Sequence, residues 1–220
     1  NLLSQQKDSI QAYNYLNLAK ENYQSNFGSN HPSLSNCFNS IGEHFLRYNQ
    51  PDSALFYFQE ALIAISPEFN DTNVFSNPEI NQVLSKTHFL KALKNKANTL
   101  SEIATRDHDI KYYKQSLATY ELAIKTIQKI RSGYISEESK LFLTDNEFET
   151  FSNALEVSHQ IYQISNDKTY LEKALSYSEL GKSAILSEAL QNNQALNIGG
   201  IPDSLITKEK QLEKSIWAYE

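Results

Sequence analysis

Residues 54–61 read Ala-Leu-Phe-Tyr-Phe-Gln-Glu-Ala, which places the small side chains of Ala54 and Ala61 on either side of Phe58. The same pattern occurs 42 positions earlier, at Ala12, Leu16 and Ala19. Residues spaced i, i+4 and i+7 lie along one face of a helix, where small side chains let a neighbouring helix approach closely. A recurrence at this interval predicts stacked helix pairs and not a single globular core.

Looser copies of the signature follow in the second half of the chain, at Ser116, Tyr120 and Ala123 and at Ala174, Ser178 and Gly181. Apolar periodicity predicts helices at about 5–26, 33–48, 52–65, 77–104, 110–131, 136–165 and 168–192. Gly28 suits the left-handed position after the first helix, and Pro32 suits the first turn of the second. Asn77 and Pro78 predict a capped start for the fourth helix.

These helices divide the chain into a repeat array and a C-terminal extension. The array spans residues 1–192 and consists of a partial repeat and three hairpins, at about 1–31, 32–68, 77–131 and 136–192. Residues 193–220 contain a linker and a last helix from Pro202, with an apolar side formed by Leu205, Leu212, Ile216 and Tyr219. That helix either packs on the preceding hairpin or has lost its partner where the sequence is cut.

The composition excludes several classes of function. The net charge of −6 argues against nucleic-acid binding, because affinity for phosphate backbones comes mainly from clustered Lys and Arg. The single cysteine, Cys37, excludes an intrachain disulfide and a cysteine-based zinc site. No apolar run reaches the roughly 18 residues of a membrane-spanning helix. The absence of methionine indicates that Asn1 is not the native start, so a removed signal peptide stays open. The cytoplasm is favoured over the periplasm.

The first complete unit resembles the tetratricopeptide repeat family. That family places Leu-Gly, Tyr, Ala, Phe and Ala where this chain has Ile41-Gly42, Phe45, Ala54, Phe58 and Ala61. The resemblance extends over about residues 5–190, and the 42-residue interval is similar to repeats of the kinesin-light-chain type. It implies an all-α fold of tetratricopeptide-like antiparallel helix hairpins, stacked in a right-handed solenoid, with a protein or peptide partner.

The second half is similar to bacterial proteins in which such repeats precede a caspase-like CHAT protease domain. The matching stretches are Ala118–Ile124, Ser139–Leu141, Leu180–Ser183, Ser187–Leu190 and Gly200–Leu205. This resemblance implies that a CHAT-like domain follows residue 220 in the parent protein. The catalytic His and Cys of that domain would then lie outside this sequence.

No motif for an enzyme occurs in the sequence: a His-Glu-x-x-His zinc site, a glycine-rich phosphate loop and a Gly-x-Ser-x-Gly elbow are all missing. Cys37 with His31 or His44 is a conceivable nucleophile and base, but a small buried thiol beside Phe38 is the simpler interpretation. The histidines lack metal-ligand spacing: His31, His44, His88, His108 and His159. We therefore expect no cofactor, no metal and no catalytic residue.

The candidate binding residues are Lys91, Lys94, Asn95 and Asn98. The first helix of each stacked hairpin usually lines the concave groove, where a Lys and an Asn one turn apart can hold a peptide carboxylate. This resembles part of the carboxylate clamp of chaperone-binding repeats. The preceding unit offers Asn39 and Glu43 to such a clamp, and the following unit offers Leu155 and His159. A solvated Lys-Asn face is the simpler alternative.

The sequence thus predicts a non-catalytic region that binds a protein or peptide and regulates a C-terminal CHAT-like protease domain. The alternative is a structural scaffold that mediates self-association or multi-protein assembly. An intrinsic enzyme ranks third, because nothing brings a nucleophile and a base together.

Overall fold

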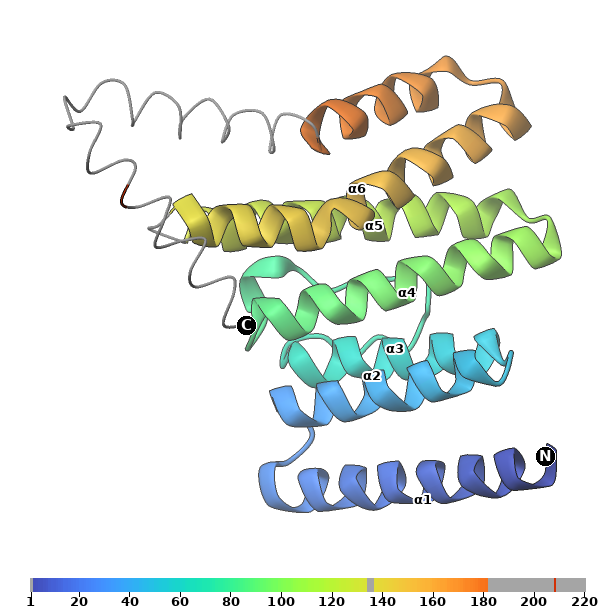
Figure 1. Ribbon diagram of the computed structural model, residues 1–220, viewed down its shortest axis with the longest axis vertical. Helices are drawn as coiled ribbons and strands as arrows, with labels where there is room; N and C mark the ends of the chain where they lie inside the picture. The colour runs from blue at the N-terminus through green and yellow to red at the C-terminus, as the bar shows by residue number, and fades with distance from the viewer. Residues whose placement is uncertain (1, 134–136, 182–207, 209–220) are drawn as a thin grey trace.

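The computed structural model describes the backbone of residues 2–133, 137–181 and 208, and the side chains of these residues except 2–9 and 137–146 (Figure 1). The described residues form helices and connecting segments, and no strand occurs among them. The helices are α1 (Leu2–Phe27), α2 (Pro32–Arg47), α3 (Pro51–Ile65), η1 (Ile80–Gln82), α4 (Lys86–Asp107), α5 (Ile110–Arg131), α6 (Glu137–Ser165) and an unlabelled helix at 168–181.

The helices form consecutive hairpins that stack on one another (Figure 1). α2 pairs with α3 and α4 pairs with α5, while the helix at 168–181 follows α6 after a two-residue break. α4 also contacts α3 and α2, and α6 contacts α5 and α4. Each hairpin therefore packs on its predecessor, which confirms the predicted all-α solenoid of stacked hairpins.

The small residues of the repeat signature lie where helices approach most closely. Ala54, Phe58 and Ala61 are fully buried. Gly42 of α2 faces the Phe58 ring so closely that a Cβ atom built on it would lie 2.4 Å from Phe58 Cε1. α2 and α3 thus nest because glycine lets the ring lie against the backbone.

The first copy of the signature differs from the others. Ala12 is exposed, whereas Leu16 and Ala19 are only half-buried. The main packing partner of α1 is α2. The other sides of α1 have no comparable covering helix in the described part of the chain. Burial of the signature therefore depends on neighbours on both sides and not on the pattern itself.

The predicted start of the fourth helix is wrong. α4 begins at Lys86, and residues 66–85, which we call the strap, run in irregular backbone with only the short helix η1. Asn77 does not cap a helix, because its side chain bonds Lys96 and Thr119. The Phe75 ring packs against Tyr112 of α5 at a centroid distance of 5.1 Å. The strap therefore joins α3, α4 and α5, which also explains the longer interval before the third copy of the signature.

The other predicted helix boundaries agree with the structure to within a few residues where the structure describes them. Gly28 has a φ of 79°, and His31 caps α2 by accepting a hydrogen bond from the Ser33 amide, directly before Pro32. α4 ends at Asp107 before His108, whose φ is 55°. The end of the helix predicted at 168–192, the linker and the helix predicted from Pro202 lie outside the described residues. None of the helices that are described has the length and apolarity to cross a membrane.

Candidate functional site

α2, α4 and α6 are the first helices of their hairpins and lie side by side on one side of the stack (Figure 1). We call their shared surface the first-helix face. The four predicted residues, Lys91, Lys94, Asn95 and Asn98, all lie on α4, the middle helix of this face. Their spacing of three and four residues directs some of them toward α2 and others toward α6.

Two of the four residues bond to α2. Lys91 Nζ lies 3.1 Å from Glu43 Oε1 and 3.4 Å from Asn36 Oδ1. Asn95 donates from Nδ2 to Glu43 Oε1 at 3.1 Å and to Asn39 Oδ1 at 3.3 Å. Glu43 is therefore shared by a lysine and an asparagine of the next hairpin.

The other two residues bond to α6 and α5. Lys94 Nζ lies 2.7 Å from Glu147 Oε2, which also accepts a hydrogen bond from Thr150 Oγ1 at 3.2 Å. Asn98 Oδ1 accepts hydrogen bonds from the Tyr120 hydroxyl and, at 3.3 Å, from Asn153 Nδ2. α4 is thus joined by polar side chains to the helices on both sides of it.

The two lysines differ in exposure. The side chain of Lys91 is 42% exposed, and that of Lys94 is 26% exposed with its partner Glu147 at 14%. Exposed ion pairs contribute only about 0–1 kcal/mol, because water screens them. The Lys94–Glu147 pair is better shielded from water. We therefore expect the attraction of Lys94 for a carboxylate to be stronger than that of Lys91.

Two cavities lie next to these residues. One, of about 380 Å³, is lined by Thr87, Leu90, Lys91, Lys94, Asn95, Ile130 and Glu147. A smaller one, of about 180 Å³, is lined by Asn98, Ser101, Tyr120, Asn153, Glu156 and Val157. The structure therefore brings three of the predicted residues to one cavity and the fourth to its neighbour along α4. The larger cavity combines apolar side chains with an ammonium group, a combination that suits a peptide side chain.

The partners expected from the neighbouring units are partly different. Asn39 and Glu43 contact α4 as the spacing suggested. From the following unit, however, Glu147 and Asn153 face α4, whereas Leu155 and His159 line a separate groove against the helix at 168–181. Glu147 and Asn153 follow Lys94 and Asn98 by 53 and 55 residues, whereas 56 residues separate Asn39 from Asn95, so the repeat interval alone did not identify them.

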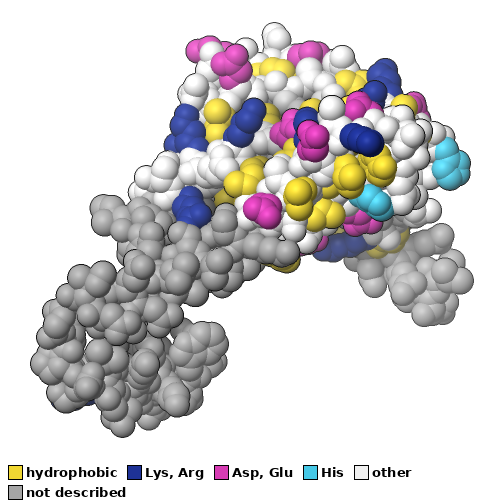
Figure 2. Space-filling model, turned by 90° about the horizontal axis from the view of Figure 1, so that it is seen from above, with side chains coloured by type: hydrophobic (Ala, Val, Ile, Leu, Met, Phe, Trp, Pro, Cys, Tyr) yellow, Lys and Arg dark blue, Asp and Glu magenta, His cyan; other side chains and the backbone are white. Residues whose placement is uncertain are grey.

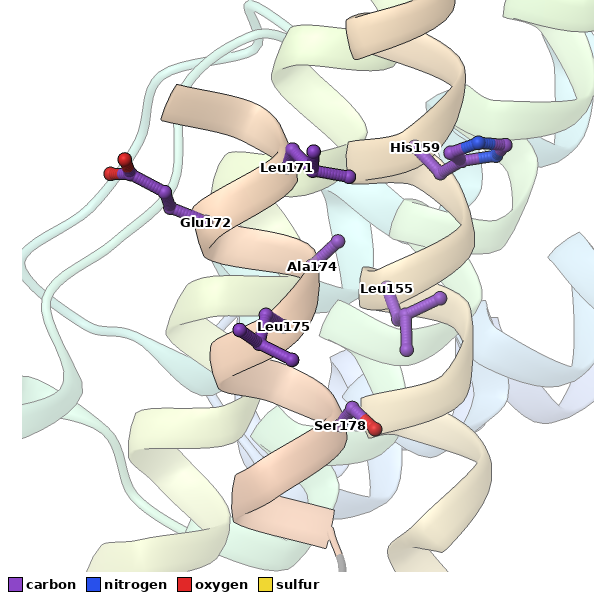
Figure 3. A pocket seen from close by; sticks show the side chains of 7 residues that line it. All are labelled: Leu155, His159, Leu171, Glu172, Ala174, Leu175 and Ser178. Carbon is purple, nitrogen blue, oxygen red and sulfur yellow. The ribbon is translucent and has the colours of Figure 1, made fainter. Parts of the chain in front are cut away.

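That separate groove lies at the last described hairpin. It has a volume of about 460 Å³ and is lined by Leu155, His159, Leu171, Glu172, Ala174, Leu175 and Ser178 (Figure 3). Figure 2 views the molecule from this end, where apolar side chains gather beside charged groups and histidine. Leu171 is 46% exposed and Leu175 is 64% exposed. Large apolar side chains that stand together at a surface commonly mark a contact site.

Cys37 has the surroundings of a packing residue. It is buried, its thiol donates to the Leu16 carbonyl at 3.3 Å, and burial raises the pKa of the thiol. The His44 ring stacks on Tyr13 at 5.8 Å, and His31 caps α2. A raised pKa disfavours the thiolate that a nucleophile needs. Within the described ranges, no three His, Cys, Asp or Glu side chains are grouped closely enough to hold a metal ion.

Lys96 is a buried charge that sequence reasoning missed. Its side chain is fully buried, and Nζ donates to Gln59 Oε1 at 2.6 Å, the Ser76 carbonyl at 2.6 Å and Asn77 Oδ1 at 2.8 Å. Burial lowers the pKa of this ammonium group to about 7. Lys96 lies on α4 beneath the strap and donates hydrogen bonds to both the strap and α3, so its role is structural. The sequence did not indicate its burial, because part of the strap that covers it was predicted to belong to the helix.

The comparisons with known proteins agree with the helical stack. Residues 1–62, which span α1, α2 and most of α3, match the family model of the tetratricopeptide repeat. No curated protein and no solved structure matches the chain. Tetratricopeptide repeats generally mediate protein–protein interactions, so the match supports a non-catalytic binding role.

Proposed function

We propose that this chain is a protein- or peptide-binding repeat region whose binding surface is the first-helix face. The observation that carries the proposal is the pair of neighbouring cavities along α4, which contain all four predicted residues. A repeat array presents such a surface on a rigid frame, because each hairpin is fixed by its neighbours.

The chemistry of the face favours a ligand with carboxylate groups. Glu43 and Glu147 already hold Lys91 and Lys94, so a peptide carboxylate has to replace one of them. The exchange leaves Glu43 or Glu147 on the face without its ammonium partner, so other contacts of the peptide have to offset that loss. Selectivity then comes from the apolar part of the larger cavity, at Leu90 and Ile130.

We further propose that the array is the regulatory part of a larger protein with a CHAT-like protease domain after residue 220. The support is the similarity of the short segments from Ala118–Ile124 to Gly200–Leu205 to proteins of that kind. Sequencing the gene beyond Glu220 tests the idea. A His-Gly followed by a later Cys motif is expected, and a stop codon or an unrelated domain contradicts it.

The binding surface is tested by substitution. Peptides selected from a random display library on the immobilised protein serve as the probe. Their affinity should fall about tenfold or more in the Lys94→Ala, Asn98→Ala double variant, which removes one charge-assisted and one neutral hydrogen-bonding group. The matched control carries Asn14→Ala and Lys125→Ala, both exposed and on α1 and α5. Equal affinity for all three proteins, at unchanged melting temperature, rules out this surface.

The scaffold function has one observation in its favour, the exposed Leu171 and Leu175 beside the groove of the last hairpin. Self-association through that groove predicts a dimer or larger species that grows with concentration. Light scattering of the protein at rising concentration measures this, and a constant monomer mass excludes self-association through the groove.

A further inference from the structure

The two cavities of the first-helix face lie along one seam between α4 and α6. Lys94 of α4 pairs with Glu147 of α6 beside the larger cavity. One turn further along α4, Asn98 accepts a hydrogen bond from Asn153 of α6 beside the smaller cavity of about 180 Å³. That volume is below the roughly 300–1,000 Å³ of small-molecule sites, so the smaller cavity suits a single side chain of a ligand.

The smaller cavity carries a negative charge that the described residues do not neutralise. Glu156 lines the cavity, and it makes no ion pair or hydrogen bond within the part of the chain that the structure describes. Burial, and after it the charges of Glu149 and Glu156, raise the pKa of the Tyr120 hydroxyl above its ordinary range. Since Tyr120 is buried at this cavity, the charges of both carboxylates act at its wall.

The hydrogen-bonding groups of the smaller cavity suit a donor with several N–H groups. Asn98 Oδ1 already accepts hydrogen bonds from the Tyr120 hydroxyl and from Asn153 Nδ2. The acceptors that have no partner among the described residues are Asn153 Oδ1, Ser101 Oγ and the Glu156 carboxylate. An arginine guanidinium presents five N–H donors in a planar fork, so it can bond several of these oxygens at once. A lysine ammonium has fewer donors and is more strongly hydrated.

We propose that the smaller cavity binds an arginine side chain of the peptide ligand, with Glu156 as its carboxylate partner. This inference rests on the proposed function and specifies the ligand of the same face. It also accounts for a loss that the proposed exchange of carboxylates creates. When a peptide carboxylate takes Lys94, Glu147 stays on the seam without its ammonium group, and a guanidinium bound in the same seam offsets that negative charge.

The spacing of the seam fixes the spacing of the two residues in the peptide. Asn98 and Ser101 follow Lys94 by about 6 and 10 Å along the axis of α4. Alternate residues of an extended peptide point to the same side and lie about 7 Å apart. A peptide that runs along the seam with an aspartate or glutamate at Lys94 therefore places the residue two positions away at the smaller cavity. The expected ligand has an acidic residue and an arginine separated by one residue.

Selection of peptides on matched variants tests the inference. A display library with eight randomised positions is selected on the immobilised wild type, on Glu156→Gln and on Glu21→Gln. Glu21 is exposed on α1, so its variant has the same change in net charge away from the face. Arginine two positions from an acidic residue should be enriched on the wild type and on Glu21→Gln, and should not be enriched on Glu156→Gln.

The affinities of one selected peptide and of its arginine-to-glutamine version complete the test. The arginine peptide should bind Glu156→Gln about tenfold or more weakly than the wild type. The glutamine peptide should bind both proteins equally, because the pair is already broken. Absence of arginine from the selected peptides, or equal affinity of the arginine peptide for both proteins, overturns the inference. A peptide that is weakened by Lys94→Ala, Asn98→Ala and not by Glu156→Gln overturns the arginine inference alone, whereas one that is weakened by neither overturns the proposed function as well.

Discussion

At the scale of single residues, Gly42 shows how a family pattern becomes a packing requirement. The sequence identified it only as a small residue at a repeat position. The structure shows that it gives the Phe58 ring room against the α2 backbone. Phe58 is fully buried, so the ring has no solvent-filled space into which it can move.

Gly42→Ala should therefore destabilise the protein, although alanine is the better helix former. The new methyl group meets Phe58 at 2.4 Å. Overpacking of this kind costs about 1–3 kcal/mol, which exceeds the gain in helix propensity of up to about 1 kcal/mol. Urea denaturation of Gly42→Ala and of Ser40→Ala, a half-buried control on the same helix, measures the difference. Equal stability of the two variants contradicts the close contact.

Lys96 makes the stability depend on pH in a defined direction. Its pKa is about 7 in the folded protein and near its ordinary value of 10.5 in the unfolded chain. Between these values the unfolded state binds more protons than the folded state, so the free energy of unfolding rises with pH. Burial raises the pKa of Tyr57 to about 12 and keeps the pKa of Tyr120 above its ordinary range, so these groups stay neutral in most of this window.

The expected result is a rise on the order of 2 kcal/mol in the stability of the wild type relative to Lys96→Met between about pH 7.5 and 9.5. Urea denaturation at both pH values measures it, and the methionine variant serves as the control because it lacks the titrating group. A difference that does not change with pH would mean that the three oxygen acceptors keep the ammonium group charged throughout.

At the scale of elements, most helices were predictable and the strap was not. Apolar periodicity, Gly28 and Pro32 indicate where helices begin and end, because these signals act locally. The segment 66–85 carries local signals too, but the Asn77 side chain bonds α4 and α5, and Pro78 is buried outside any helix. A helix cap and a tertiary contact use the same amide group, so the sequence alone does not distinguish them.

The strap should loosen when Asn77 is removed. Asn77→Ala deletes one acceptor of Lys96 and the bond from Asn77 Nδ2 to Thr119 Oγ1. Leaving a buried ammonium group with an unmet hydrogen bond costs about 1–3 kcal/mol. Hydrogen exchange should become faster across residues 66–85 and remain unchanged in α2. The exposed Asn70→Ala is the control on the same segment, and identical exchange in the two variants would show that Asn77 does not hold the strap.

At the scale of the whole molecule, the repeat pattern predicted the stack and placed the candidate site on its middle helix. It did not predict which groups face each other across helices. Glu147 and Asn153 contact α4, while Leu155 and His159 face the helix at 168–181. The register between successive hairpins depends on the lengths of the connections, which vary along this chain from the short turn before α2 to the strap before α4. Sequence spacings within one hairpin therefore predict side-chain contacts better than spacings between successive hairpins do.

The central claim is that the first-helix face binds the partner. Hydrogen exchange of the wild-type protein, with and without a peptide selected from a display library, tests it most directly. Binding at this face should slow exchange in α2, α4 and α6 near Asn39, Lys94 and Asn153, and leave α3 unchanged. Protection confined to α3 or the strap would contradict the account.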